Sequence, residues 1–323
     1  MSAGRPTQVE LAWVSGEFRP RADVAVPLGD AGFVLGSSVT EQLRTFHGDL
    51  FLADEHFARL AGSLAVVGLV PTPGLAAIRG AAVRVARENR SRLAAARGGE
   101  PGPDLGVVIV VTPGDQPAQH EGAAAVPRTF VHSFPLAFNV WAAAYDRGVS
   151  LRTVPVRQVP DECWPVAAKV RSRLHYFLAD RAAEAAEPGA RAVLEHLDGR
   201  ISETSTANVA VVRGGRVLTP PAADVLSGVS LACARRLAAG LGIGWEERSL
   251  VAADLATADE ILLTSTPSCI LPATRFDGRP VGDGVPGDVF HRLLAAWNGL
   301  VGLDIAAQAR TQAGRRPRIV GRD

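Results

Sequence analysis

The sequence contains almost no lysine. Of its 323 residues, 34 are Lys or Arg, and Lys169 is the single lysine among them. The other 33 cations are arginines, whose guanidinium groups stay protonated and cannot act as nucleophiles. A lysine that loses its proton can attack an aldehyde and hold it as a Schiff base. Lys169 is therefore the first candidate for covalent chemistry, and chance survival in an Ala- and Arg-rich chain is the alternative.

Cysteine is also scarce, and no apolar stretch approaches membrane-spanning length. Cys163, Cys233 and Cys269 are odd in number, widely separated and without C-x-x-C spacing. This pattern fits a reducing compartment and argues against a structural zinc or another metal site. The first ten residues lack the apolar core of a signal peptide. These absences predict a cytoplasmic protein without a membrane partner.

Charge of one sign is not in excess. The net charge is +1, and only the last dozen residues concentrate positive charge. Nucleic acid and anionic membranes are therefore poor candidates as partners. With 47% hydrophobic and 21% charged residues, the composition is that of a globular protein. The length exceeds the usual size of one core, so we expect two domains.

The first part of the chain has the patterns of strands, then helices, then strands. Alternation around a Ser-Gly turn predicts a hairpin over 9–19. Apolar residues at helical spacing predict a helix over 55–67, and a second helix is expected over 74–95. Runs of β-branched residues predict strands over 106–112 and 129–134.

The second part alternates between strands and helices. We expect a strand over 150–157 and a helix over 168–186, followed by two hairpins that turn at Asp198-Gly199 and Gly214-Gly215. Then come a helix from Ser230, a strand over 259–264 with a turn at 265–268, and a helix over 289–301. The predicted organisation is a small domain over 1–134, a linker over 135–148, a larger domain over 149–305, and a disordered basic tail over 306–323.

The residues that precede Lys169 are apolar, and desolvation of an ammonium favours the free amine. A lysine-bound aldehyde cofactor would be pyridoxal 5'-phosphate. Its phosphate needs a helix N-terminus and an arginine. Its pyridine nitrogen needs a carboxylate that keeps the ring protonated. The alternative is a lysine at a helix start whose ammonium reaches solvent.

Candidates for these roles occur in the second part and on one early helix. Gly228 opens an Ala- and Leu-rich helix, where the amides of Val229 and Ser230 can reach phosphate oxygens. Arg59 lies on the helix over 55–67, and Glu203 precedes a loop of small hydroxyl residues. Taken singly, these features fit a capped surface helix, a solvated arginine and an edge-strand charge. Their occurrence in one chain favours a cofactor site.

Together these segments resemble the class IV pyridoxal-phosphate aminotransferases of fold type IV, from about Trp13 to Asp304. The stretch GDAGFVLGSSVTEQLR over 29–44 is similar to the opening signature of that family. His56-Phe57-Ala58-Arg59-Leu60 is similar to the motif whose arginine binds the cofactor phosphate, and Lys169 stands where the Schiff-base lysine belongs. The family includes branched-chain and D-amino-acid aminotransferases and aminodeoxychorismate lyases.

The resemblance implies a two-domain α+β fold with pyridoxal 5'-phosphate between the domains and a homodimeric assembly. It also implies an amino acid and a 2-oxo acid as small-molecule substrates, and Lys169 as the catalytic residue. The implied cofactor-binding residues are Arg59, Lys169, Glu203, Thr206, Asn208, Gly228, Val229, Ser230, Ser265 and Thr266.

The subfamily stays open. Branched-chain enzymes have a tyrosine where this chain has Leu174, and no Tyr-x-Arg pair occurs near 105–107. Leu174 suits the lyase and D-amino-acid branches, whereas Glu41 is more typical of aminotransferases. Pro267 has no amide hydrogen to offer a substrate carboxylate. The candidates for that task are Ser268, Arg44, Arg171 and Arg173.

Three functions are open at this point. The first is a transaminase, and the second is a lyase that releases pyruvate and 4-aminobenzoate from aminodeoxychorismate. The third is a cofactor-binding relative that has lost turnover and serves a partner protein. The presence of Lys169, Glu203 and Arg59 together argues against the third.

Overall fold

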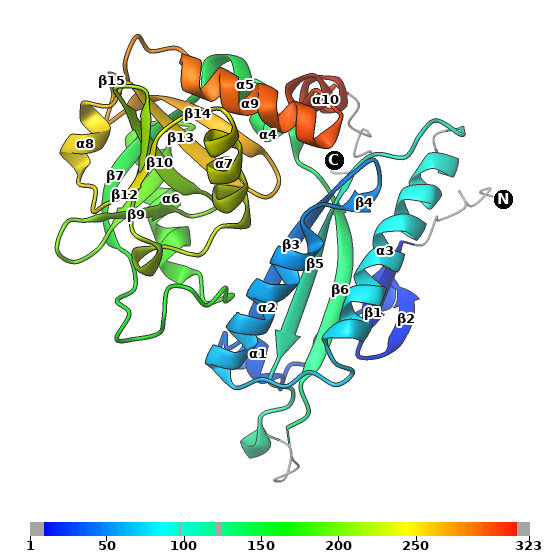
Figure 1. Cartoon of the computed structure of the whole chain (residues 1–323). Helices are drawn as coiled ribbons and strands as arrows, with labels where there is room; N and C mark the ends of the chain where they lie inside the picture. Colours follow the sequence, from blue (N-terminus) through cyan, green and yellow to red (C-terminus); the bar gives the residue numbers. More distant parts are fainter. Residues whose placement is uncertain (1–9, 97, 120–124, 315–323) are drawn as a thin grey trace. The chain divides into compact units, whose positions relative to one another are not determined.

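The computed structural model describes residues 10–96, 98–119 and 125–314, which divide into two compact units (Figure 1). The N-terminal unit contains the residues up to Leu136 together with Ala167–Arg173. The C-terminal unit contains Ala137–Val166 and the chain from Leu174 onward. Within the described residues, no helix combines the length and apolar character that crossing a membrane requires.

An antiparallel sheet forms the centre of the N-terminal unit. In the described part of this unit, six strands follow the order β2-β1-β6-β5-β3-β4, and every neighbouring pair is antiparallel. The strands are β1 (Leu11–Val14), β2 (Glu17–Pro20), β3 (Val39–Phe46), β4 (Asp49–Leu50), β5 (Leu105–Thr112) and β6 (Arg128–Pro135). The connections contain η1 (Arg21–Asp23), α1 (Ala31–Val34) and η2 (Pro117–Gln119).

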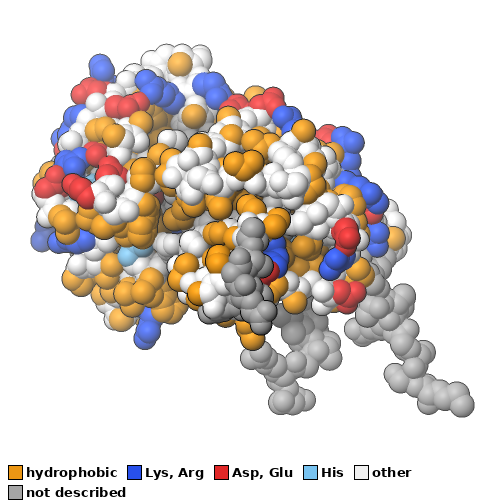
Figure 2. Space-filling view, turned by 90° about the horizontal axis from the view of Figure 1, so that it is seen from below, with side chains coloured by type: hydrophobic (Ala, Val, Ile, Leu, Met, Phe, Trp, Pro, Cys, Tyr) orange, Lys and Arg blue, Asp and Glu red, His pale blue; other side chains and the backbone are white. Residues whose placement is uncertain are grey.

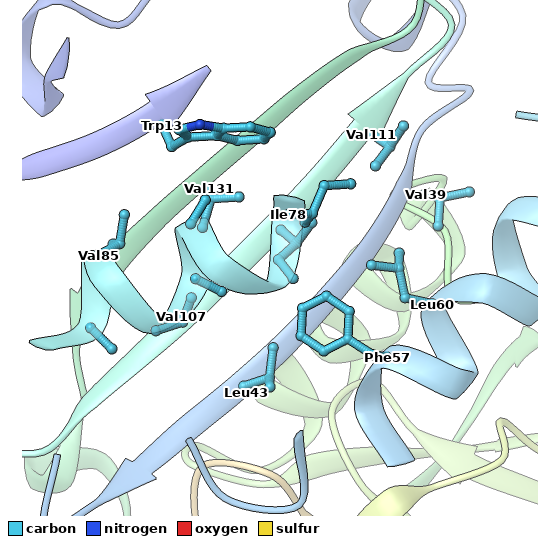
Figure 3. Close-up of a cluster of buried hydrophobic side chains, with 14 of the residues drawn as sticks. Trp13, Val39, Leu43, Phe57, Leu60, Ile78, Val85, Val107, Val111 and Val131 are labelled. Atoms are coloured by element: carbon cyan, nitrogen blue, oxygen red, sulfur yellow. The ribbon is translucent and has the colours of Figure 1, made fainter. Parts of the chain in front are cut away.

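Helices α2 (Ala53–Val67) and α3 (Leu75–Ala96) cover one face of this sheet. The hydrophobic core of the unit lies between these helices and the sheet (Figure 3). Phe57 and Leu60 of α2 pack there against Val39 and Leu43 of β3. Successive side chains of a strand point to opposite faces, so Glu41 projects toward the same helix-covered face as Val39 and Leu43. The fold therefore places one carboxylate among apolar side chains.

A second, larger sheet forms the C-terminal unit. In the described part of the unit, nine strands take part, in the order β12-β11-β10-β13-β14-β7-β8-β9, with β15 paired to β14. An additional pairing of β9 with β10, at Glu203 and Asn208, closes six of the strands into a ring. The strands are β7 (Val149–Arg157), β8 (Arg191–Glu195), β9 (Ile201–Thr204), β10 (Asn208–Arg213), β11 (Arg216–Thr219), β12 (Trp245–Glu247), β13 (Glu260–Ser265), β14 (Cys269–Phe276) and β15 (Arg279–Pro280).

Helices surround this second sheet. Ala179 and Ala183 of α6 pack on β7 and β8 in a small buried cluster with Val154 and Leu194. The helices of the unit are α4 (Phe138–Trp141), α5 (Ala144–Arg147), α6 (Leu174–Ala186), η3 (Ala222–Asp224), α7 (Val229–Gly240), α8 (Ala252–Ala256), α9 (Asp288–Val301) and α10 (Ile305–Ala313).

Large apolar side chains of both units also reach the surface, and Figure 2 shows hydrophobic and charged side chains on the same face. Leu28, Phe33 and Phe177 are examples of exposed apolar residues.

Most predicted elements are confirmed within one or two residues. The two N-terminal helices correspond to α2 and α3, and the hairpins at Asp198-Gly199 and Gly214-Gly215 correspond to β8–β9 and β10–β11. Of the hairpin expected over 9–19, residue 9 lies outside the described residues, and the rest forms β1 and β2.

The helix predicted over 168–186 is wrong in its first turns, because α6 begins only at Leu174. Val170, shortly before it, forms an isolated antiparallel bridge with Val39 at the start of β3. The amide of Thr40 donates to the carbonyl of Lys169, and the amide of Arg171 donates to the carbonyl of Ser38. Pairing with a strand edge outweighs the helical composition of this segment and places it in the N-terminal unit.

The chain also differs from the expectation at two other places. The stretch expected as a linker over 135–148 contains α4 and α5, and Trp141 and Tyr145 are buried there. The expected disordered tail begins with helix α10, because the Asp304 side chain caps the Ala307 amide and Ile305 and Ala309 are buried. Residues 315–323 of the expected tail lie outside the described residues.

Candidate active site

One face of α2 carries polar side chains toward β3 in the N-terminal unit. His56, Arg59 and Ser63 follow at spacings of three and four, which bring side chains to one face of a helix. Arg59 donates to both oxygens of Glu41, from Nε at 3.0 Å and from Nη2 at 2.6 Å. His56 Nδ1 lies 3.0 Å from Glu41 Oε1. The side chains of His56, Arg59 and Glu41 are almost completely buried.

The protonation states in this cluster follow from its contacts. Burial alone would raise the pKa of Glu41, but the hydrogen bond from His56 and the charge and hydrogen bonds of Arg59 outweigh it and lower the pKa from 4.5 to about 2. Burial lowers the pKa of His56 despite its bond to Glu41, and the charges of Arg59 and Lys169 act in the same direction. Because an ionised carboxylate only accepts, the neutral His56 carries its hydrogen on Nδ1.

The lysine belongs to the same neighbourhood. Its amide donates to Ser63 Oγ at 3.1 Å, and the residue is half-buried. The charge of its ammonium contributes to the lowered pKa of His56. The N-terminal unit thus brings Lys169 and Arg59 together, one capable of covalent chemistry and the other of binding an anion.

A second polar cluster surrounds Glu203 in the C-terminal unit. Tyr176 donates its hydroxyl hydrogen to Glu203 Oε1 at 2.7 Å, and Asn208 Nδ2 donates to Oε2 at 3.0 Å. Glu203 lies in β9 and Asn208 begins β10, so the pairing that closes the strand ring also sets their separation. The carboxylate is buried, and each of its oxygens receives a hydrogen bond.

Asn208 also connects this cluster to the start of α7. Its Nδ2 donates to the carbonyl of Leu226 at 3.0 Å. A Cβ at Gly228 would lie 1.9 Å from Asn208 Oδ1, so a larger residue at this N-cap position would displace the Asn208 side chain. The first amides of α7, at Val229 and Ser230, point out of the helix start, where an anion is stabilised.

The turn between β13 and β14 contributes hydroxyl groups. Ser265 Oγ and Ser268 Oγ lie 2.8 Å apart, and Thr266 is half-buried. Thr264 lies opposite Asn208 in the sheet. Among the described residues, the hydroxyl of Thr264 is buried and has no hydrogen-bond partner. A buried orphan hydroxyl beside an anion-binding helix start is suited to a bound polar ligand.

The other predicted residues are placed as follows. Thr206 lies in the turn between β9 and β10, where its amide approaches Thr204 Oγ1 at 3.3 Å. Arg44 is 1% exposed, and its guanidinium lies 3.8 Å from the centre of the Phe46 ring. Arg173 is half-buried in the N-terminal unit. In residues 10–96, 98–119 and 125–314, no group of His, Cys, Asp and Glu side chains is suited to hold a metal ion.

The structure divides the predicted site residues between the units. Arg44, Arg59, Lys169 and Arg173 belong to the N-terminal unit, and the others belong to the C-terminal unit. Sequence reasoning missed His56 and Tyr176 as partners of the site, and it noted Glu41 only as a subfamily feature. The spacing of three between His56 and Arg59 was a usable signal. Tyr176 had none, because its contact with Glu203 depends on tertiary packing.

These features fit pyridoxal 5'-phosphate. The close approach of Gly228 to Asn208 and the orphan hydroxyl of Thr264 place polar groups near the start of α7. A buried carboxylate that accepts hydrogen bonds suits a protonated ring nitrogen, and the only lysine suits an aldehyde.

Comparison with known proteins agrees with this chemistry. Residues 38–276 match the model of the family described as amino-transferase class IV. The chain is 28% identical over 284 residues to the D-alanine aminotransferase of Bacillus licheniformis, covering 87% of this chain and 94% of that protein. The chain therefore belongs to the class IV aminotransferases, and it is a transferase that uses pyridoxal 5'-phosphate.

Solved structures show the same fold. The branched-chain amino acid aminotransferase of Escherichia coli superimposes with a TM-score of 0.80 at 24% identity, covering 91% of this chain and 95% of that chain. The branched-chain aminotransferase of Thermoproteus uzoniensis, solved with norvaline, superimposes with a TM-score of 0.78 at 24% identity, covering 91% of this chain and 95% of that chain. The predicted fold type IV architecture is confirmed.

Proposed function

We propose that this chain transfers an amino group between an amino acid and a 2-oxo acid. The observation that carries the proposal is the place of the single lysine. The backbone of Lys169 is hydrogen-bonded to Thr40 of β3 and to Ser63 of α2, in the neighbourhood of Arg59. The other 33 cationic side chains are arginines, which do not lose their proton, so Lys169 is the only one that can offer a free amine there.

The proposed roles follow from the chemistry that each unit offers. In the N-terminal unit, Lys169 would bind the aldehyde and Arg59 the phosphate, with Glu41 fixing the guanidinium and His56 fixing Glu41. In the C-terminal unit, Glu203 would hold the proton on the ring nitrogen. The proposed further contacts of the C-terminal unit come from Thr206, Asn208, Gly228, Val229, Ser230, Ser265 and Thr266.

Proton movement is the chemical task of the chain itself. When bound, pyridoxal 5'-phosphate supplies an electron-withdrawing ring conjugated to the carbon that carries the amino group. Lys169, once its amine is free, takes a proton from the substrate Cα and returns it at C4′. Glu203 accepts hydrogen bonds from Tyr176 and Asn208, and as an acceptor it would hold the ring-nitrogen proton in place. The buried ion pair keeps Arg59 from rotating toward solvent.

The candidates for binding the substrate carboxylate are arginine side chains and Ser268. Arg171 is exposed, but partial desolvation and then the nearby charge of Arg173 lower its pKa, so two guanidinium groups lie close together on the segment that follows Lys169. A carboxylate between them would relieve their repulsion. Arg44 is less suited, because its guanidinium is already packed on Phe46.

Borohydride trapping tests the covalent role. Holoprotein reduced with borohydride and digested should carry the pyridoxyl group on the peptide that contains residue 169. Lys169→Arg should fold, as judged by its circular dichroism, but remain colourless and without turnover. A label on any other peptide contradicts the proposal.

A substrate panel tests the reaction. The relatives named above are a D-alanine and two branched-chain enzymes, so the panel should include D-alanine and L-valine beside other L- and D-amino acids. Loss of the aldehyde-form absorption on adding an amino acid, and its return with a 2-oxo acid, supports transfer. Pyruvate release from aminodeoxychorismate without that change would instead support the lyase.

We also expect a homodimer in the cytoplasm that binds neither nucleic acid nor membranes. Sedimentation of the holoprotein measures the assembly, and a monomer at micromolar concentration would contradict it.

A further inference from the structure

Tyr176 holds Glu203 through hydrogen bonds whose direction is fixed. Gln158 is 3% exposed, and its Oε1 accepts from the amide of Val159 at 3.0 Å. Its Nε2 therefore points the other way and donates to Tyr176 Oη at 3.0 Å and to Ser202 Oγ at 3.1 Å. Because Gln158 occupies an acceptor position of the tyrosine oxygen, the hydroxyl hydrogen of Tyr176 is directed to Glu203 Oε1.

The same direction holds at each end of this network. Ser202 donates to the carbonyl of Asp224 at 3.0 Å, so its oxygen is available to accept from Gln158. On the other side, Asn208 Nδ2 donates to the carbonyl of Leu226 and to Glu203 Oε2, at 3.0 Å each. A carbonyl oxygen only accepts, which fixes Nδ2 as the donor. Tyr176 and Asn208 thus both donate to Glu203.

We propose that Tyr176, oriented by Gln158, is a positioning residue that keeps Glu203 an ionised acceptor and so keeps the proton on the ring nitrogen of bound cofactor. If Glu203 were protonated, its carboxyl hydrogen would face the donor hydrogen of either Tyr176 or Asn208, which is unfavourable. The inference rests on the role proposed above for Glu203. It adds two residues, Tyr176 and Gln158, that act on the cofactor through this carboxylate.

The effect of losing the tyrosine hydroxyl has a definite sign. Tyr176→Phe keeps the ring but removes one donor from Glu203. The carboxylate then becomes more basic and draws the proton away from the ring nitrogen. Loss of a hydrogen bond to a charged group changes an equilibrium or rate constant by about ten- to a hundredfold. We therefore expect kcat to fall by about that factor, with KM changed less than about threefold.

The chain offers a matched control. It has two tyrosines; Tyr176 is half-buried, and the other, Tyr145, is buried and donates a hydrogen bond of the same 2.7 Å length to the carbonyl of Ser268. Tyr145→Phe removes an equally short bond in the same unit without touching Glu203. Both variants should lose similar stability, so a difference between them in cofactor protonation cannot come from stability alone.

The decisive readout is the nitrogen-15 chemical shift of holoprotein loaded with cofactor labelled at the ring nitrogen. Tyr176→Phe should move the signal toward the unprotonated value, Gln158→Leu should move it less, and Tyr145→Phe should leave it unchanged. A Tyr176→Phe signal equal to that of the wild type, when Glu203→Gln shifts it, overturns the inference. No shift in Glu203→Gln itself would remove the role proposed for Glu203, and the inference with it. Circular dichroism establishes that each variant is folded, and Gln158→Leu retains the tyrosine if Tyr176→Phe fails to fold.

Discussion

The two polar clusters stabilise a buried carboxylate in different ways. In the N-terminal unit, Glu41 is compensated by a full opposite charge, since Arg59 donates to both of its oxygens. In the C-terminal unit, two neutral groups donate to Glu203, the hydroxyl of Tyr176 and the amide of Asn208. The first carboxylate is committed to its cation. The second accepts hydrogen bonds from an uncharged hydroxyl and an uncharged amide, and this difference fits a structural role for Glu41 and a chemical role for Glu203.

Glu41→Gln should be the more destructive of two matched substitutions. It leaves the buried guanidinium of Arg59 uncompensated, and breaking such a pair costs about 3–5 kcal/mol. Glu203→Gln keeps an oxygen acceptor for one neutral donor and should cost about 1–3 kcal/mol. Urea unfolding of the apoproteins measures both. Glu88, which pairs with Arg84 and Arg92 on the surface of α3, provides a control, because Glu88→Gln should change stability by less than about 1 kcal/mol. Equal losses for Glu41→Gln and Glu203→Gln would contradict the comparison.

Acid should reveal the ion pair of Glu41 directly. Its pKa is lowered from 4.5 to about 2, so the folded carboxylate stays ionised while the unfolded one takes up a proton. Its contribution, about 3 kcal/mol, is complete above the unfolded pKa and is lost as the pH falls from about 4.5 toward 2. Urea midpoints at about pH 5 and about pH 3 should therefore fall further in the wild type than in Glu41→Gln. Parallel losses in the two proteins would show that Glu41 has no lowered pKa.

Gly228 approaches the Asn208 side chain closely, so a side chain at this position should disturb the C-terminal cluster. Gly228→Ala would place Cβ 1.9 Å from Asn208 Oδ1 and displace the amide that holds Glu203. Overpacking of this kind costs about 1–3 kcal/mol. Calorimetric titration of the apoprotein with pyridoxal 5'-phosphate should also show weaker binding. A variant as stable as the wild type, with unchanged affinity, would mean that this contact does not define the site.

The smallest expected effect is a gain. Gly62 lies inside α2, and nothing lies within 4 Å of the position that an added methyl group would take, so Gly62→Ala meets no obstacle. Alanine should stabilise the helix by about 0.5–1 kcal/mol, because glycine loses more backbone freedom on folding. Thermal unfolding of the apoprotein measures the change. A loss of stability would contradict the open space found around Gly62.

The sequence was sufficient for elements whose pattern is local. Phe57 and Leu60 repeat at the spacing of α2, and Asp198-Gly199 has the composition of a tight hairpin turn, so both were predicted correctly. The segment around Lys169 was not, because its backbone partners are Ser38 and Thr40, far away in the chain. Composition alone favoured a helix there, and only the pairing with β3 reverses that preference.

The same distinction applies to the candidate site. Lys169, Glu203 and Arg59 stood out by chemistry and motif, and the family match supports the resemblance on which their roles were based. Their supporting partners were hidden, since Tyr176 and Gln158 are separated from Glu203 by 27 and 45 positions. Nothing in a tyrosine two residues into a helix indicates which carboxylate its hydroxyl will reach. Tyr176 and Gln158 can be identified as partners of Glu203 only from the tertiary structure.

The six-strand ring of the C-terminal unit closes where β9 and β10 pair at Glu203 and Asn208 alone. That seam is short, so its amides should be among the first of the ring to exchange with deuterated solvent when the seam opens. A ligand that contacts Glu203 would hold the two strands together at this point. Occupancy of the ring-nitrogen position should then be detectable as slower amide exchange on both sides of the closure.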